Sequence, residues 1–274
     1  MDTRGEFLQD LPPSTSEYEF KGVKDILQKS EYEYSLLEHD PTKGQFTVFN
    51  NVPPEPIDSG NTEAIGHLFS SYHTSLKILI IKIPLRPHQV LAREFDLLLV
   101  PKARQIAEIF AVGRVTVKGT TRSKAPDCAY QPGTFPAGRD EKWPSVVLEI
   151  GLSESRAKLE RDCHWWLNDS RGEVKIALGI SINRTCKEII IKRWELQLRP
   201  TRGDPNSTAP APIATQEIAI TSPQNSGNIT VNGAPLILEF AKMFLRQPVS
   251  QADAQITKTE LKTLAQRAWT FQGF

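Results

Sequence analysis

Two acidic residues stand beside short apolar runs in the middle of the sequence and could act together. Asp127 lies two residues before Ala129, the first residue of the β-type run 129–130, and Glu149 lies in the apolar run 146–150. The two acids are 22 positions apart, a spacing that allows a β-hairpin to bring both carboxylates to one point beside a sheet. The alternative is a turn-forming Asp after Pro126 and a surface Glu at a strand end.

Paired carboxylates at one point favour a metal site. A hard divalent cation takes a few carboxylate oxygens and keeps several of its waters. Such an ion can activate a water molecule and neutralise the charge that develops on a phosphodiester during hydrolysis. We therefore expect Asp127 and Glu149 to bind Mg²⁺ or Mn²⁺.

The motifs around these acids form an ordered set. The set is Ser123-Lys124, Pro126-Asp127, Val146-Val147-Leu148-Glu149, Ser153-Glu154-Ser155 and Trp165-Trp166-Leu167. It resembles the PD-(D/E)XK nuclease superfamily, specifically the nuclease-like proteins widespread in fungi, over roughly residues 61–270. The resemblance implies a restriction-endonuclease-like α/β (α+β) core with a mixed β-sheet flanked by helices. It also implies hydrolysis of nucleic acid, Asp127 and Glu149 as metal-binding acids, and the backbone carbonyl of Ile150 near the metal.

The lysine that this resemblance implies two residues after the second acid is missing, because that position is Gly151. We favour Lys158, on the helix that follows Glu149, as the replacement catalytic cation, because Asp162 at i+4 could steer it. The alternative is an ordinary i,i+4 ion pair on a solvated helix face. Arg161 is the next choice, followed by Lys175 on a neighbouring strand.

Two further residues belong to the predicted site. Lys124 belongs to the Ser-Lys motif that precedes Asp127. Glu63 falls on the first helix after residue 60, where the superfamily often places another acid. A solvated carboxylate that is favoured by the helix dipole is the preferred interpretation of Glu63.

The pattern along the chain predicts an irregular acidic N-terminal extension over residues 1–60, followed by one nuclease-like domain over 61–274. The extension contains several prolines and has little periodicity beyond one short helix near 23–29. The expected helices are 61–72 capped by Asn61 or Thr62, 88–110 with a break at Pro101, one after Ser153, one opening at Pro235 and 258–269. The expected strands are 76–83, 115–117, 129–130, 146–150, 174–182 and 189–198, with weak ones at 217–220 and 228–231 in a loop or hairpin.

Charge is distributed unevenly although the total is only +1. Residues 1–40 contain four basic and ten acidic side chains, whereas 114–202 contain seventeen basic and eleven acidic ones. The basic segment favours nucleic acid as a partner, DNA more than RNA. The three scattered cysteines favour an intracellular protein, and no apolar run long enough for a membrane span is present.

Two functions therefore compete. The first is a metal-dependent endonuclease in which Asp127 and Glu149 bind the ion and Lys158 assists. The second is a catalytically inactive nuclease-fold module that binds nucleic acid or protein, with Gly151 marking the lost chemistry. A third, structural hypothesis is that the acidic first 40 residues cover the basic segment. The sequence is compatible with a homodimer but shows no recognisable dimer interface.

Overall fold

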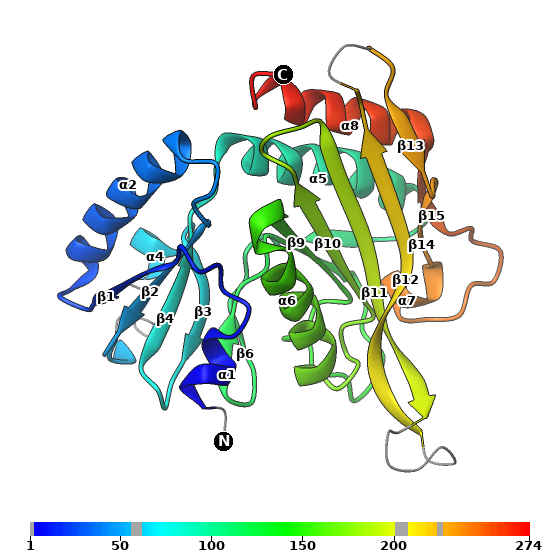
Figure 1. The fold of residues 1–274 in the computed structure, drawn as a ribbon. Coiled ribbons are helices and arrows are strands. Elements are labelled where there is room, and N and C mark those ends of the chain that lie inside the picture. Colours follow the sequence, from blue (N-terminus) through cyan, green and yellow to red (C-terminus); the bar gives the residue numbers. More distant parts are fainter. Residues whose placement is uncertain (1–2, 56–61, 201–207, 224–226) are drawn as a thin grey trace.

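The computed structural model describes residues 3–55, 62–200, 208–223 and 227–274 and has a mixed α+β architecture of two main β-sheets flanked by helices (Figure 1). The helices are α1 Arg4–Leu8, α2 Val23–His39, α4 Thr62–Ile65, α5 Arg86–Ile106, η1 Ser153–Ser155 (3₁₀), α6 Arg156–Asp169, α7 Phe240–Phe244 and α8 Lys258–Thr270. The strands up to residue 132 are β1 Ser16–Glu19, β2 Phe46–Asn50, β3 Phe69–His73, β4 Ile78–Lys82, β5 Ile109–Ala111, β6 Val117–Lys118, β7 Arg122–Lys124 and β8 Cys128–Pro132. The later strands are β9 Val146–Leu152, β10 Ile176–Ile182, β11 Glu188–Pro200, β12 Thr208–Thr221, β13 Thr230–Asn232, β14 Leu236–Leu238 and β15 Ala254–Ile256.

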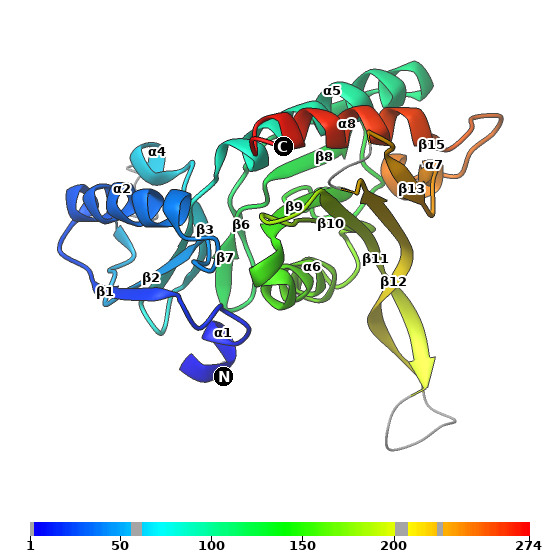
Figure 2. The same ribbon diagram turned by 45° about the horizontal axis from the view of Figure 1, so that its top comes forward.

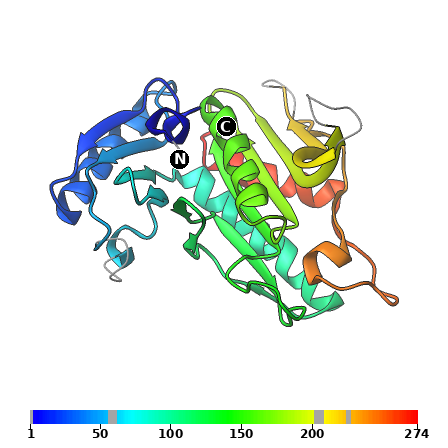
Figure 3. The ribbon, with the colours of Figure 1, turned by 90° about the horizontal axis from the view of Figure 1, so that it is seen from below.

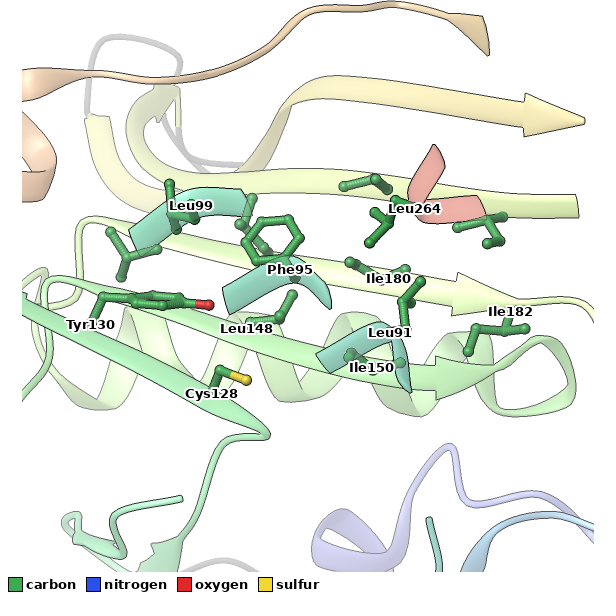
Figure 4. Packing of buried hydrophobic residues seen from close by; sticks show 14 of the residues in the cluster. Leu91, Phe95, Leu99, Cys128, Tyr130, Leu148, Ile150, Ile180, Ile182 and Leu264 are labelled. Carbon is green, nitrogen blue, oxygen red and sulfur yellow. The ribbon is translucent and has the colours of Figure 1, made fainter. Parts of the chain in front are cut away.

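The larger sheet has the strand order β13-β12-β11-β10-β9-β8-β5. Its central strands β9 and β10 are parallel, and every residue of both is buried. Helix α5 packs Leu91, Phe95 and Leu99 on one face of this sheet (Figure 4). Helix α6 packs on the opposite face, so β9 and β10 are covered on both sides and show no alternation of polar and apolar residues.

The smaller sheet has the order β1-β2-β4-β3-β7-β6. It lies beside the larger sheet, with α2 on its outer side and α6 facing it from the larger sheet (Figure 3). Strand β3 is antiparallel to both of its neighbours, β4 and β7. Strands β4 and β7 therefore run in the same direction and end at the same edge of the sheet.

The N-terminal segment is not the irregular extension that we expected. Its described residues form α1, β1, the 17-residue helix α2 and β2. Strand β2 pairs with β4, so it belongs to the smaller sheet. Ile26 and Leu37 of α2 are fully buried, and this tertiary packing outweighs the weak local pattern. The expected boundary at residues 60/61 falls within 56–61, which lies outside the described residues.

Three predicted helices differ from the structure. The helix expected over 61–72 is the short α4 followed by strand β3, whose five residues are all buried, so the spacing of Phe69 and Tyr72 comes from a strand. Asn61 lies outside the described residues. The break expected at Pro101 is absent because α5 continues through it, held by the buried Leu99 and Ala103. The helix expected from Pro235 is β14, which pairs with β15, and then the five-residue α7.

The strands predicted between residues 115 and 198 are confirmed, with shifted ends, and so is the last helix. Ser155, and not Ser153, precedes α6 as its N-cap. Strand β12 is much longer than the weak strand predicted at 217–220, because it pairs with β11 along its whole length. Together β11 and β12 extend beyond the rest of the sheet as a two-stranded arm (Figure 2).

Candidate active site

The two predicted acids converge because β8 and β9 form an antiparallel pair. Asp127 directly precedes β8, and its backbone N–H donates to Leu148 O of β9 at 3.0 Å. The side chain of Ile150 points toward α5 (Figure 4), so its neighbour Glu149 points to the α6 side of the sheet. The backbone N–H of Ile150 donates to Asp127 Oδ2 at 2.7 Å and fixes this carboxylate beside β9.

Asp127 is surrounded by positive charge. Lys82 Nζ donates to its Oδ2 at 2.6 Å, and Arg114 donates to its Oδ1 at 2.6 Å. His88 Nε2 lies 3.2 Å from Oδ2. Burial alone would raise the pKa of Asp127, but Lys82, His88 and Arg114 hold it well below its usual value. The carboxylate is therefore ionised at any physiological pH.

Glu149 is held by a hydrogen bond and an ion pair from different elements. Trp166 of α6 donates its indole N–H to Glu149 Oε1 at 2.7 Å. Lys124, the last residue of β7, places its Nζ 3.1 Å from the same oxygen. The motif tryptophan thus belongs to the core, as its spacing predicted, and also orients the second acid.

Lys124 links Glu149 to a third buried acid. Its Nζ lies 3.1 Å from Asp162 Oδ1 on α6. Burial alone would lower the pKa of Lys124, but Asp162 and Glu149 raise it overall, so Lys124 stays protonated. Burial would raise the pKa of Asp162, and Lys124 and Lys158 lower it instead. The cluster is thus a continuous chain of alternating acids and amines.

Lys158, the cation favoured from the sequence, lies one step away from the acid pair. It forms an ion pair with Asp162, as the i,i+4 spacing predicted, and lies over the ring of Phe46 at 5.2 Å. The pair is buried and not on a solvated helix face. Burial, reinforced by Lys124, lowers the pKa of Lys158 to about 8 against the pull of Asp162.

The other predicted cations do not lie among the acids. Arg161 is on the outer side of α6, where it pairs with Asp10 of the N-terminal segment at 2.6 Å. Lys175 donates to Gly172 O at 2.5 Å, and it precedes β10 by one residue. Because Gly179 of β10 pairs with Glu149, Lys175 lies at the far end of the sheet. Glu63 is in α4, and its side chain lies outside the described residues.

A side chain at Gly151 would lie beside α6. A Cβ added there would lie 3.4 Å from Leu159 of α6 and 3.5 Å from Gln45 Nε2. These distances are ordinary van der Waals contacts, so a Cβ at this position would pack against Leu159 and Gln45 without displacing them. The ammonium near Glu149 comes instead from Lys124 on the neighbouring sheet.

Sequence reasoning missed Lys82, His88 and Arg114. Lys82 ends the apolar strand β4 and is 3% exposed. The available sequence signal is a lysine that directly follows the apolar run Ile78–Ile81. Lys82 contacts Asp127 across 45 residues of sequence, so no local pattern predicts the pair.

The donor set fits a divalent cation. Lys82 Nζ lies 2.6 Å from Asp127 Oδ2 and 3.5 Å from Glu149 Oε2, so both carboxylates reach one point that already accommodates positive charge. Two carboxylates are a sufficient protein contribution to a Mg²⁺ site. Within the part of the chain that the structure describes, no cluster of three or more His, Cys, Asp or Glu side chains is arranged to hold a metal.

None of the described helices is long and apolar enough to cross a membrane.

Comparisons with known proteins assign no family. No protein-family model matches the chain, and no curated protein matches it. One matching solved structure is described as "a putative nuclease belonging to DUF820" from Anabaena variabilis. It shares 12% sequence identity and a TM-score of 0.39, and the match covers 72% of this chain and 90% of that one. A likeness of this size transfers no function.

Proposed function

We propose that the chain is a metal-dependent hydrolase that cleaves phosphodiester bonds of nucleic acid, with Mg²⁺ or Mn²⁺ as cofactor and DNA favoured over RNA. The observation that carries the proposal is the convergence of Asp127 Oδ2 and Glu149 Oε2 on one cationic position, 2.6 and 3.5 Å from the same nitrogen. Two convergent carboxylates can hold an ion that activates water and orients the phosphodiester for hydrolysis.

The energetic character of the cluster supports a functional role. Three acids and four basic side chains meet in one region: Asp127, Glu149 and Asp162, with Lys82, Lys124, Lys158 and Arg114, of which only Arg114 is partly exposed. Desolvating ion pairs costs about as much as their attraction returns, so apolar packing would stabilise a core at least as well. Buried titratable groups with shifted pKa values concentrate at functional sites.

The residues divide into those that would bind the metal and those that hold the metal-binding Asp127 in place. Asp127 and Glu149 would hold the ion, with the carbonyl of Ile150 as the further ligand that the family resemblance implies. The bound ion would supply an activated water and neutralise charge on the phosphate. The His88 and Arg114 contacts and the Ile150 N–H keep Asp127 ionised and fixed in orientation.

We assign the assisting cation to Lys124 in place of Lys158. Lys124 Nζ lies 3.1 Å from Glu149 Oε1, whereas Lys158 reaches the acid pair only through Asp162. A protonated amine at this position stabilises negative charge as it develops on the scissile phosphate. Its raised pKa keeps it protonated at neutral pH.

The test is cleavage of supercoiled plasmid and single-stranded DNA by the purified chain with Mg²⁺ or Mn²⁺. The proposal predicts cleavage that is lost in Asp127→Asn and Glu149→Gln. Glu160→Gln is the matched control, because Glu160 lies on the outer side of α6 and pairs with Lys192. Cleavage that persists in both acid variants contradicts the proposal. Light scattering of the same samples measures whether two copies of the chain form a dimer.

A catalytically inactive module that binds nucleic acid or protein is the second candidate. One observation favours it: Asp127 and Glu149 are only 6% and 1% exposed, and lysines contact both. A module that does not use metal should bind DNA with the same affinity in EDTA as in Mg²⁺, and it should not cleave the DNA. Gel-shift and cleavage assays on one preparation therefore separate the two functions.

A further inference from the structure

We infer that Lys82 is the internal counter-ion of the acid pair, occupying the position that a divalent cation would take, so that metal binds only when the Lys82 ammonium leaves. This inference rests on the proposed function for its metal, but it concerns a residue of this chain. Lys82 is a positioning residue that holds Asp127 and Glu149 together in the metal-free protein.

The geometry makes the two cations mutually exclusive. Lys82 Nζ already donates to Asp127 Oδ2 at 2.6 Å and lies 3.5 Å from Glu149 Oε2. Mg²⁺ would need to approach these oxygens to about 2.1 Å. An ion that shares both oxygens with the ammonium would overlap it sterically and repel it electrostatically.

The placement of Lys82 also requires the two carboxylates. It is the last residue of β4, and the four residues before it are fully apolar and buried. A buried ammonium without partners is strongly unfavourable. Asp127 and Glu149 provide the negative charge that keeps Lys82 in the protein interior, and Lys82 screens their mutual repulsion.

The charges around the site lead to the same conclusion. The buried groups Asp127, Glu149, Asp162, Lys82, Lys124 and Lys158, together with the partly exposed Arg114, comprise three acids and four bases. With Lys82 in place these groups have one more positive than negative charge, and without it the two signs are equal in number. Removal of this one amine leaves the two acids facing each other with less compensation, a better site for Mg²⁺ or Mn²⁺.

The experiment measures Mn²⁺ affinity from the electron paramagnetic resonance signal of free Mn²⁺, without substrate. Lys82→Gln removes the charge and keeps a hydrogen-bond donor, and we expect at least tenfold tighter binding than in the unmodified chain. Lys43→Gln is the matched control, because Lys43 is also a buried lysine but pairs with Glu33 and contacts none of the residues of the site. We expect no change in Mn²⁺ affinity for this control.

Two further variants complete the test. Lys82→Arg keeps the positive charge and should bind Mn²⁺ no more tightly than the unmodified chain. In Lys82→Gln combined with Glu149→Gln the gain should disappear, because one metal ligand is lost. Equal Mn²⁺ affinity of Lys82→Gln and the unmodified chain overturns the inference, and so does an equal gain in Lys82→Arg.

Folding is followed by thermal melting with and without Mn²⁺. Repulsion between the two acids should lower the Tm of Lys82→Gln, and Mn²⁺ should raise that Tm more than it raises the Tm of the unmodified chain. A variant that Mn²⁺ does not stabilise counts against the inference. The readouts also separate the two proposals. Tighter Mn²⁺ binding without DNA cleavage by any variant retains Lys82 as counter-ion and rejects the nuclease.

Discussion

Lys124 Nζ lies 3.1 Å from Glu149 Oε1, so the lysine that stands three residues before one acid of the site contacts the other acid. The contact forms because Lys124 ends β7 in the smaller sheet while Glu149 lies in β9 of the larger one. The candidate active site is therefore assembled across two sheets, with α6 supplying Trp166 and Asp162 between them.

Replacing Lys124 should remove the assisting cation. We expect Lys124→Met to lower kcat for plasmid cleavage by about 100-fold, the usual effect of deleting one group that stabilises transition-state charge. Lys124→Arg should recover part of the rate. Lys158→Met should change kcat less than Lys124→Met, and the opposite ranking would return the catalytic role to Lys158.

The stability of the protein should depend on pH through Lys158. Its pKa is about 8 in the folded protein, below the ordinary 10.5, mainly because the amine is buried. Between these values the unfolded chain binds more protons than the folded one, so the unfolding free energy rises with pH across this window. The penalty is fully present below pH 8 and amounts to about 3 kcal/mol at most.

Urea unfolding at several pH values checks this expectation. The difference in unfolding free energy between the unmodified chain and Lys158→Met should change from pH 8 to 10.5 in favour of the unmodified chain. A difference that does not vary with pH would show that Lys158 has an ordinary pKa.

Trp166→Phe should separate orientation of Glu149 from core packing. The phenyl ring fills most of the indole volume but cannot donate to Glu149 Oε1. We expect kcat to fall about tenfold with little change in KM, and the unfolding free energy to fall by about 2 kcal/mol. Trp143→Phe is the control, because Trp143 packs on Trp166 in the same apolar cluster. Equal losses of kcat in both variants would reduce Trp166 to a packing role.

Asp10 tests the hypothesis that the acidic N-terminal segment covers basic residues. Its carboxylate pairs with Arg161 at 2.6 Å beside a pocket of about 560 Å³ that Arg122 and Trp165 also line. Deleting residues 1–40 would remove β1 and α2 from the fold, so the sharper change is Asp10→Asn.

We expect Asp10→Asn to bind DNA about threefold more tightly at 50 mM salt, with the gain vanishing at high salt. Glu31→Gln changes the charge equally on the exposed side of α2 and serves as the control. Equal gains in DNA affinity in both variants would indicate a general effect of net charge, and not a specific role of Asp10 in covering basic residues.

The hairpin that joins the two acids could be predicted from the sequence, because Asp127 and Glu149 lie on neighbouring strands with short-range pairing. The ion pair between Lys158 and Asp162 was also predictable from the i,i+4 spacing of the two residues. Lys82 was not, because its position between the acids depends on how two sheets pack. The smaller sheet was missed for a similar reason: β3 is buried along its whole length, and β1 pairs with a strand thirty residues later.

The most direct test of the account is a crystal structure of the protein grown with Mn²⁺, with anomalous scattering used to locate the ion. We expect a Mn²⁺ peak bound by Asp127 and Glu149, with the Lys82 ammonium displaced from both carboxylates. A structure at saturating Mn²⁺ in which Lys82 still bridges the two acids, with no anomalous peak between them, would contradict the account.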